Sequence, residues 1–299
     1  MTVALLLKPD KPEAVALARE LCALLSSRGV EALVAGAPPE AAADLAPARL
    51  VDESALGEPR LLVVLGGDGT LLHGADLVAD AGVPILGINL GNLGFLTSCP
   101  PELGRATLEL ALDGRLPYER RMRLRVELSR ASGERVARIG CNDAVISQGA
   151  LARLIEFDAS LDGAAIATYR ADGLIIATPT GSTAYSLAAG GPILTPSVEG
   201  LVLTPICPHT LTNRPVVVPA ASRVRVNIGE AAQHARLTVD GQWSADLDPG
   251  DAIEVHAANR PLLLHRPADT SYFEILRAKL HWGERVGHDD RATSRAPSR

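Results

Sequence analysis

The first hundred residues alternate between short aliphatic runs and amphipathic stretches. Four of the runs have the length and composition of buried parallel strands: Val3–Leu7, Glu31–Val34, Leu61–Leu65 and Val83–Asn89. Between the first two, the apolar residues from Val15 to Leu25 recur on one face of a helix, and Gly29 follows its end. The repeated order of strand, helix and strand predicts an α/β domain over residues 1–115, built on a doubly wound parallel sheet.

The pattern changes near Pro117 to an alternation with a period of two. Leu124–Leu128, Ile155–Ala159 and Val224–Ile228 each alternate apolar and polar residues, and turn residues separate such runs. This predicts a β-rich, β-sandwich-like second domain over residues 116–268. The aromatic and aliphatic residues of 269–283 predict a segment that packs back onto the first domain. The polar residues 284–299 predict a disordered tail.

Composition and charge narrow the class of protein. The 299 residues are 47% hydrophobic and 21% charged, which is typical of a globular protein with two cores. The net charge of −6 argues against a nucleic-acid partner, and no apolar run reaches the ~20 residues of a membrane-spanning helix. The N-terminal run lacks a basic lead and a cleavage site, so a strand is expected there and not a signal peptide. The four cysteines are widely scattered: Cys22, Cys99, Cys141 and Cys207. Their spacing predicts free thiols and a cytoplasmic location.

The turn Gly66-Gly67-Asp68-Gly69-Thr70 directly follows a buried strand. Its glycines are expected to adopt positive φ and to let a ligand approach the backbone, while the start of the next helix favours phosphate. A carboxylate beside phosphates is repulsive, so Asp68 needs either a bridging metal ion or a proton to accept. The alternative is that Asp68 only forms the turn or caps the helix. The P-loop pattern is absent, and Leu72 stands where the dinucleotide fingerprint needs its third glycine.

Two further segments follow predicted strands. Gly87–Leu96 is rich in glycine, but the spacing differs from the dinucleotide fingerprint, and a tight loop is the simpler interpretation. Asp172–Ser186 holds a strand, a hydroxyl-rich turn and a helix of small residues, which Gly190-Gly191-Pro192 ends. Hydroxyls and amides at such a helix start bind ribose or phosphate oxygens, or they cap the helix. Ser182 lacks the flanking glycines of a nucleophile elbow, so we reject a hydrolase.

The order of the motifs resembles that of a known enzyme family. Six segments occur in the order found in NAD kinases: Gly66–Thr70, Gly87–Leu96, Asn142-Asp143, Asp172–Gly191, Pro205–His209 and Asp240–Gln242. The resemblance covers about residues 1–283. The glycine–acid turn alone is shared with diacylglycerol kinases, sphingosine kinases and phosphofructokinases, whereas T-P-T-G-S-T-A-Y-S followed by G-G-P-I is far more specific. The resemblance implies Mg²⁺-dependent phosphoryl transfer from ATP or polyphosphate to the adenosine ribose 2′-hydroxyl of NAD, giving NADP.

The resemblance also implies roles for individual residues. Asp68 matches the family's proton acceptor, and Gly69 lies beside the bound NAD. Asn142 and Asp143 match a pair that holds the ribose hydroxyls, with Asp143 where many members carry Glu. Asp172 matches a contact at the nicotinamide end. The other positions that match NAD contacts are His73, Arg153, Arg170, Gln242 and, beside the adenine, Thr183, Ala184, Tyr185, Ser186, Leu187 and Ala188. In some relatives histidine replaces the arginine at 170.

Taken singly, these residues also have structural interpretations. Asn142-Asp143 is a typical turn, Arg170 a typical solvated charge, and Gln242 a typical hairpin-turn residue. Arg153 can pair with Glu156. Only their joint order along the chain favours the functional interpretation.

Two rival functions stay open from the sequence. A lipid kinase would share the glycine–acid turn, and a non-catalytic NAD-binding sensor would share the whole pocket. No residue decides between ATP and polyphosphate, whether NADH is accepted, or which side chains hold a metal ion. Relatives assemble as dimers or tetramers, usually through the β-rich domain, so a homodimer or homotetramer is expected.

Overall fold

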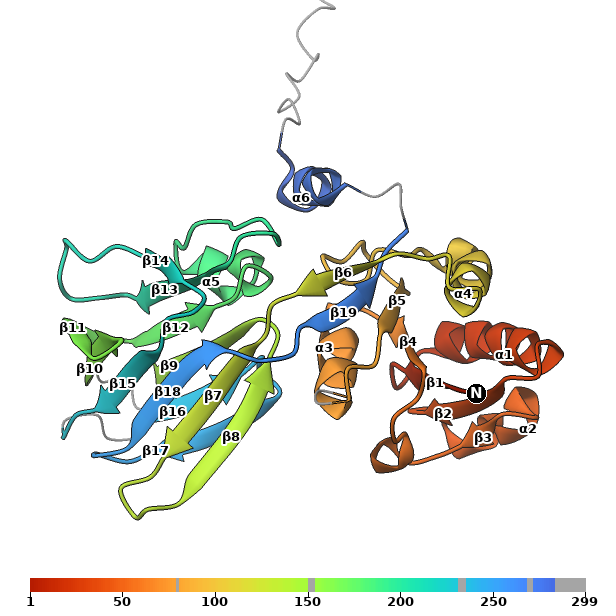
Figure 1. Cartoon of the computed structure of the whole chain (residues 1–299), viewed down its shortest axis with the longest axis horizontal. Coiled ribbons are helices and arrows are strands. Elements are labelled where there is room, and N and C mark those ends of the chain that lie inside the picture. The colour runs from red at the N-terminus through yellow and green to blue at the C-terminus, as the bar shows by residue number, and fades with distance from the viewer. Residues whose placement is uncertain (79–80, 150–153, 231–234, 268–270, 283–299) are drawn as a thin grey trace, which may run out of the picture.

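The computed structural model describes residues 1–78, 81–149, 154–230, 235–267 and 271–282. The chain forms an α/β part that begins at the N-terminus and a β-rich part beside it, with α3 between them and α6 over their junction (Figure 1). The α/β and sandwich-like fold classes predicted from the sequence are both confirmed. Within the described residues, no helix is long and apolar enough to cross a membrane.

The first sheet has seven strands in the order β3-β2-β1-β4-β5-β19-β6. Their bounds are β1 Thr2–Leu7, β2 Glu31–Ala35, β3 Arg49–Leu50, β4 Leu61–Gly66, β5 Ile85–Asn89, β6 Tyr118–Arg121 and β19 Leu262–His265. All neighbours pair in parallel except β19 and β6. From β1 the chain builds β2 and β3 on one side, and it then crosses to β4 on the other side of β1. The carboxyl ends of β1 and β4 are therefore the switch point of the sheet.

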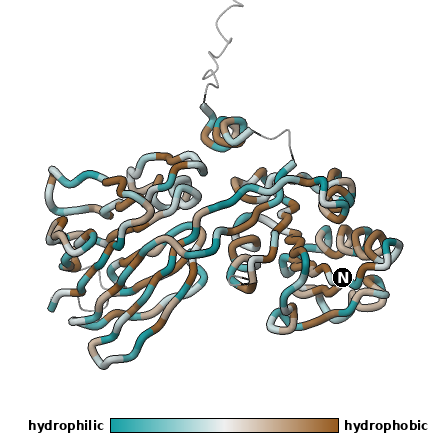
Figure 2. Tube along the Cα trace, viewed as in Figure 1, coloured by the Kyte–Doolittle hydropathy of each residue, from teal (hydrophilic) through white to brown (hydrophobic). Residues whose placement is uncertain are grey.

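Helices cover both faces of this sheet. They are α1 Pro12–Ser27, α2 Ala42–Leu45, α3 Asp68–Leu77 and α4 Gly104–Leu112, with short 3₁₀ turns η1 Pro39–Ala41, η2 Glu53–Ala55 and η3 Pro101–Leu103. Ala18 of α1 and Leu108 of α4 belong to the core on one face, and Leu71 of α3 belongs to the core on the other. The strands between two buried faces are apolar along almost their whole length, as Figure 2 shows for the strands near the N-terminus.

The second part is a sandwich of two antiparallel six-stranded sheets. The first has the order β11-β10-β15-β18-β7-β8, with bounds β7 Leu124–Ser129, β8 Arg135–Gly140, β10 Ile155–Leu161, β11 Ala164–Ala171, β15 Val224–Ile228 and β18 Ala252–Ala257. The second, which we call the site sheet, has the order β14-β13-β12-β9-β16-β17, with bounds β9 Asp143–Gln148, β12 Gly173–Ala177, β13 Gly200–Ile206, β14 Val216–Pro219, β16 Ala235–Val239 and β17 Trp243–Leu247. Alternate residues such as Val126 and Ile146 enter one shared core, so the period-two pattern of the sequence is explained.

Two strands of the first sheet come from the part of the sequence assigned to the second domain. β6 and β19 both lie within residues 116–268, yet they extend the parallel sheet from β5. They are the two segments by which the chain enters and leaves the sandwich. The division at residues 116 and 268 therefore stays a prediction, and the sheet pairing does not follow it at either end.

Helix α6, Tyr272–Leu280, lies over the junction of the two parts. Its Tyr272 ring is 6.4 Å from that of Phe95 in the α/β part, and the Tyr272 hydroxyl donates to the Leu194 carbonyl of the sandwich at 3.4 Å. The helix begins with a capping box between Ser271 and Glu274. The C-terminal segment was expected to pack on the first domain; α6 contacts that domain and the sandwich.

Candidate active site

The glycine–acid turn connects β4 to α3. Gly67 is the N-cap of α3, and Asp68 is its first residue. None of Gly66, Gly67 and Gly69 has a positive φ, so that expectation was wrong. The strand passes into the helix with ordinary extended and helical backbone angles. Any requirement for glycine in this turn therefore comes from the absence of a side chain and not from the backbone conformation.

Glycine is required at one position of the turn and leaves space at two others. A Cβ on Gly66 would lie 2.6 Å from Thr70 Oγ1 and 3.2 Å from Lys8 Cβ. A Cβ on Gly67 or Gly69 would meet no described heavy atom within 4 Å. The start of α3 therefore borders open space beside Gly67 and Gly69, and the unpaired N–H groups and the dipole of a helix start favour an anion.

The Asp68 carboxylate is held by the loop that follows β5. Oδ2 accepts a hydrogen bond from Phe95 N at 2.8 Å. Oδ1 accepts three, from Leu96 N at 3.1 Å and from Thr97 N and Thr97 Oγ1, both at 2.9 Å. Because a carboxylate oxygen offers two lone pairs, Oδ1 is saturated and Oδ2 keeps one lone pair. The Asp68 carboxylate is therefore held in place, with one lone pair of Oδ2 open to a further donor.

The loop that holds Asp68 is itself fixed from two sides. Asn89 Nδ2 donates to Asn92 O at 2.5 Å, and its Oδ1 accepts from Gly91 N at 2.9 Å. On the other side, Arg266 Nη2 donates to Phe95 O at 3.2 Å. Gly87–Asn89 complete β5, so the tight-loop interpretation holds only for the rest of Gly87–Leu96, and that loop also positions Asp68.

On the sandwich side, Asn142 and Asp143 stand where β9 begins. Asp143 pairs with Ala177 at the carboxyl end of β12, and Thr178 N donates to Asn142 O at 2.8 Å. The Asp240 carboxylate accepts three backbone hydrogen bonds, from Cys141 N at 2.6 Å, Asn142 N at 2.7 Å and Asp143 N at 3.0 Å. Asp240 and Gly241 both have positive φ, as a type I′ hairpin turn requires. The Asn142-Asp143 backbone is therefore fixed by two neighbouring turns.

This end of the site sheet lies against α3. Cys141 packs into the same core as Leu71 and Leu72 of α3. A narrow gap between the two parts is lined by Asp76 of α3 and by Gln242 of the hairpin turn. The helix that starts at Asp68 therefore also supports the segment that carries Asn142 and Asp143.

Burial changes the protonation of Asp143. Its side chain is only 5% exposed, and no hydrogen bond from a described residue to its carboxyl group is present. Burial, with a smaller effect from the charge of Asp240, raises the pKa of Asp143 from 3.8 to about 7. Burial also raises the pKa of Asp240, but its three backbone donors stabilise its charged form. Asp143 therefore holds its proton up to about pH 7, whereas the backbone donors favour the charged form of Asp240.

The hydroxyl-rich turn is largely occupied by its own hydrogen bonds. Thr178 Oγ1 donates to Cys141 O at 2.6 Å, Ser182 Oγ donates to Pro179 O at 2.6 Å, and Ser186 Oγ contacts Thr204 Oγ1 at 2.9 Å. Of the stretch from 183 to 188, Tyr185 and Ala188 are exposed, Thr183, Ala184 and Leu187 are half-buried, and Ser186 is buried. A ligand at this turn can reach the backbone and the exposed side chains, but not the Ser186 hydroxyl.

The remaining candidate residues lie apart from this cluster. His73 Nε2 is 2.8 Å from Glu53 Oε2, one turn into α3. Arg170 of β11 is exposed and forms a 3.6 Å ion pair with Glu156, its partner on the neighbouring strand β10. Asp172 precedes β12, so it lies at the opposite end of the site sheet from Asp143, about 17 Å of extended chain away. Arg153 lies outside the described residues.

Comparison with known proteins agrees with this geometry. The family model "ATP-NAD kinase N-terminal domain" matches residues 3–116, and "ATP-NAD kinase C-terminal domain" matches residues 141–266. The chain belongs to the NAD kinase family. A protein of Geotalea daltonii named NAD kinase is 44% identical over 284 residues, which cover 95% of this chain and 99% of the relative. The NAD kinase of Geobacter sulfurreducens is 43% identical over 284 residues, with the same coverage.

Two solved structures are similar over almost the whole chain. Yeast NADH kinase, complexed with NADH, has a TM-score of 0.88 and 29% identity, covering 96% of this chain and 89% of the yeast chain. An NAD kinase from Archaeoglobus fulgidus, in complex with ATP, has a TM-score of 0.73 and 28% identity, covering 94% and 99%. The family predicted from the motifs is thus confirmed, as is the enzyme class of phosphotransferase. These findings support an NAD kinase and not a lipid kinase.

The described part of this NAD kinase offers no protein cage for a metal ion near the turn. The grouping of three potential ligands that it does contain is Glu127, Glu254 and His256, on strands of the other sandwich sheet, and both glutamates already pair with arginines. At the turn, one lone pair of Asp68 Oδ2 is free. Mg²⁺ prefers substrate phosphates with one or two carboxylates, so the residues here fit an ion that arrives on the phosphoryl donor.

Sequence reasoning missed two positioning elements of this NAD kinase. The hydrogen bonds from residues 95–97 to Asp68 were not foreseen, although β4 and β5 are consecutive parallel strands, whose carboxyl ends meet at one edge. Asp240 was not among the predicted site residues, whereas its carboxylate holds the Asn142-Asp143 segment. Only a three-dimensional pairing of β9 with β16 brings those residues together.

Proposed function

We propose that this member of the NAD kinase family transfers the terminal phosphoryl group of a donor to the adenosine ribose 2′-hydroxyl of NAD, with Asp68 as the proton acceptor. A bond forms between the 2′-oxygen and the terminal phosphorus, and the bond from that phosphorus to its bridging oxygen breaks. The hydroxyl proton passes to Asp68 Oδ2, and the donor leaves one phosphate shorter. The observation that supports this most directly is the lone pair on Oδ2, held in place beside the open start of α3.

The ribose of NAD is proposed to bind where Asn142 and Asp143 begin β9. Asp143 is only 5% exposed, and a carboxyl group with no hydrogen bond from the described residues suits a vicinal diol, which supplies two donors. A diol stabilises the charged carboxylate, so binding of NAD is expected to lower the pKa of Asp143 and to release a proton. The other predicted contacts stay proposals: Gly69, His73, Arg153, Arg170, Asp172, Thr183, Ala184, Tyr185, Ser186, Leu187, Ala188 and Gln242.

Mg²⁺ is proposed to enter as part of the donor complex. It offsets the charge of the phosphates, which would otherwise repel Asp68. Asp68 is a weak base for an alcohol, but in a loose phosphoryl-transfer transition state the hydroxyl loses its proton late. The chain therefore needs to orient the hydroxyl and hold an acceptor ready, and the fixed carboxylate does both.

A cytoplasmic location and assembly into a homodimer or homotetramer are likewise proposed. All four cysteines are free thiols, which suits a reducing compartment. The apolar side chains of Val216, Val217 and Leu211 on and before β14 are exposed, which favours an interface on the sandwich.

The proposal is tested by Asp68→Asn, with NAD, Mg²⁺ and ATP supplied to the purified protein. General-base help is worth about 10²–10⁴-fold, so kcat should fall by that factor while the Kd for NAD changes less than about threefold. An asparagine also loses one hydrogen bond from the 95–97 loop, so loop disorder is a competing cause. Thr97→Val removes a loop donor but keeps the carboxylate, and it should retain kcat within about threefold. Full turnover in Asp68→Asn, or an equal loss in Thr97→Val, would contradict the base assignment.

A further inference from the structure

Two arginines are almost completely buried where β6 meets β19. Arg121 of β6 is 2% exposed, and Arg266, which directly follows β19, is 4% exposed. The carboxylate between them belongs to Glu119, two residues before Arg121 and therefore on the same face of β6. Arg121 Nε and Nη2 donate to Glu119 Oε2 at 2.9 Å and 2.7 Å, and Arg266 Nη1 donates to Glu119 Oε1 at 3.3 Å. We call these three residues the arginine cluster.

The arginine cluster carries a net positive charge. Burial disfavours the carboxylate of Glu119, but the charges of Arg121 and Arg266 and their hydrogen bonds lower the pKa of Glu119 below its usual range, so it is ionised at neutral pH. One carboxylate therefore offsets only one of the two guanidinium charges. Arg266 Nε is also a buried donor without a partner among the described residues, so this position is not optimised for stability alone. A buried charge of this kind needs a further polar or anionic group close by.

That group is the loop that holds Asp68. Arg266 Nη2 donates to Phe95 O at 3.2 Å. The same planar peptide group carries Leu96 N–H, which donates to Asp68 Oδ1 at 3.1 Å. A guanidinium, a peptide group and a carboxylate thus form one chain of hydrogen bonds, with a cation at one end. Hydrogen bonds in such a chain polarise one another, so the charge of Arg266 strengthens the bond to Asp68.

Phe95 is held at its backbone and at its ring. Its N–H donates to Asp68 Oδ2 at 2.8 Å, its carbonyl accepts from Arg266, and its ring is 6.4 Å from that of Tyr272 in α6. The four hydrogen bonds to the Asp68 carboxylate all come from residues 95–97. Release of this loop would therefore loosen every one of them, whereas loss of a single donor within the loop leaves the others in place.

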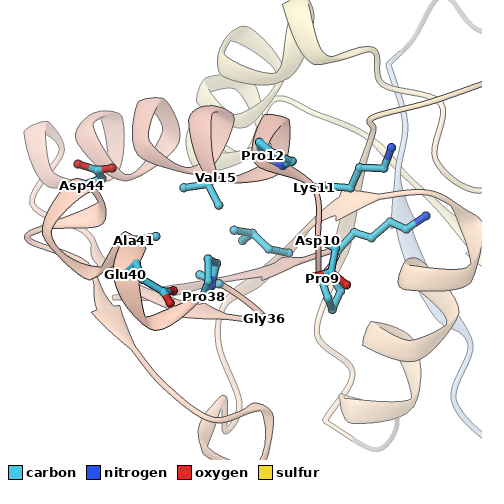
Figure 3. A pocket seen from close by; sticks show the side chains of 13 residues that line it. Pro9, Asp10, Lys11, Pro12, Val15, Gly36, Pro38, Glu40, Ala41 and Asp44 are labelled. Carbon is cyan, nitrogen blue, oxygen red and sulfur yellow. The ribbon is translucent and has the colours of Figure 1, made fainter.

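The arginine cluster is placed to hold the protein and not to bind a ligand. A cavity of about 830 Å³ lies between α1 and residues 36–44, with Lys11 and Asp44 among the side chains that line it (Figure 3). No member of the arginine cluster lines that cavity, and both arginines are covered by the protein. Arg266 therefore affects the chemistry of a substrate through the loop.

We propose that Arg266 is a positioning residue for the phosphoryl transfer, which holds Asp68 in the orientation that accepts the 2′-hydroxyl proton by fixing the peptide group of Phe95 and Leu96. Lysine cannot replace it, because one ammonium group lacks the planar fork that reaches Glu119 and Phe95 at the same time. Glu119 and Arg121 fix the guanidinium in turn. This role rests on the proposed function and deepens it by adding a residue that lies outside all six motifs.

The test compares kcat with the KM for NAD in matched variants. Arg266→Gln removes the charge but leaves Glu119 paired with Arg121, so no buried carboxylate loses its last partner. Because small displacements of a catalytic group are costly, kcat should fall about 10–100-fold while the KM for NAD stays within about twofold. The control is Arg121→Gln, which removes an equally buried cation of the same cluster. Within the described residues Arg121 has no hydrogen bond to the 95–97 loop, so this variant should keep kcat within about threefold.

Chemical rescue and hydrogen exchange distinguish positioning from a general loss of structure. In Arg266→Ala, guanidinium chloride far below its unfolding range should restore most of the lost kcat. Urea, a neutral molecule of the same shape, and sodium chloride should not. Without any substrate, the amides of residues 95–97 should exchange faster in Arg266→Gln than in the wild type, and at the wild-type rate in Arg121→Gln.

The outcomes separate the role of Arg266 from the proposed function. A wild type that forms no NADP from any donor contradicts the proposed function, and unchanged exchange of residues 95–97 in Arg266→Gln overturns the role of Arg266 independently. With an active wild type, full kcat in Arg266→Gln, an equal loss in Arg121→Gln, or rescue by urea as strong as by guanidinium would overturn it. Absence of rescue in a folded Arg266→Ala would overturn it as well. If both of these variants fail to fold, Arg266→Lys keeps the buried charge and provides the comparison, and full kcat in that variant would overturn the role.

Discussion

Replacement of Asp143 by asparagine is expected to stabilise the empty protein and to weaken NAD binding. The pKa of Asp143 rises from 3.8 to about 7 on folding, because burial disfavours the carboxylate and Asp240 adds a like charge. Below pH 4 the folded and unfolded chains both hold the proton, so the group does not affect stability there. Between pH 4 and 7 only the unfolded chain releases it, so stability falls as the pH rises and stays low above pH 7.

The structure sets an upper limit on this effect. Each pH unit between the two pKa values costs about 1.4 kcal/mol, so about three pH units give at most about 4 kcal/mol above pH 7. Asparagine has the same shape and does not titrate. A buried amide without partners costs about 1–3 kcal/mol at any pH, so the pH dependence is more informative than the absolute stability.

The assay is urea unfolding of the variant and the wild type at pH 5 and pH 8. Trp243 begins β17 beside this end of the site sheet, so tryptophan fluorescence reports on the sandwich. The stability of Asp143→Asn relative to the wild type should rise by about 2–3 kcal/mol from pH 5 to pH 8. Asp246→Asn, on the exposed edge of the same sheet, should show almost no such change. An equal difference at both pH values for Asp143→Asn would refute the reasoning.

The same variant should lose affinity for NAD. A hydrogen bond to a charged group is worth about 1.5–3 kcal/mol, so the KM for NAD at pH 8 should rise roughly 10–100-fold. In the wild type, the KM should fall as the pH rises through about 7, where Asp143 ionises. Stability and binding thus respond in opposite directions, as expected for a buried group kept for function. An unchanged KM would remove Asp143 from the ribose site.

Further predictions concern the glycine turn and the hairpin turn. Gly66→Ala should lower the free energy of unfolding by about 1–3 kcal/mol, because its Cβ would lie 2.6 Å from Thr70 Oγ1. Gly67→Ala meets no neighbour and should lower it by less than about 0.5 kcal/mol. Thermal unfolding of the two variants measures the difference. Asp240→Asn leaves one of three backbone N–H groups without its acceptor, and should raise the KM for NAD with little change in kcat. Because it removes a like charge, it should also shift the pH dependence of that KM to lower pH through Asp143, which an effect on folding alone would not do.

The sequence predicted the fold well where one periodicity dominated. The run at Val224–Ile228 coincides with β15, and Leu61–Leu65 is β4 without its last residue. The sheet to which β6 and β19 belong was not predictable, since a short apolar run does not reveal which sheet it joins. Only the pairing of Leu264 with Ile85 assigns β19 to the parallel sheet.

The candidate site was predictable in its motifs and not in its geometry. The turn at Asp68 and the pair at Asn142 stand on separate parts that meet at α3, which the order of the motifs along the chain does not show. The internal bonding of Ser186, the pairing of His73 with Glu53 and the role of Asp240 depend on tertiary contacts. Sequence spacing does not contain that information.

The central claim is tested most directly by following the transferred phosphate. The purified protein is incubated with NAD and Mg²⁺ and with ATP that carries a labelled terminal phosphate, and the position of the label in the product is determined by phosphorus NMR. The label should appear on the 2′-oxygen of the adenosine ribose, and Asp68→Asn should reduce its rate of appearance about 10²–10⁴-fold. Binding of NAD without any transfer of label, or transfer at the full rate in Asp68→Asn, would contradict the account.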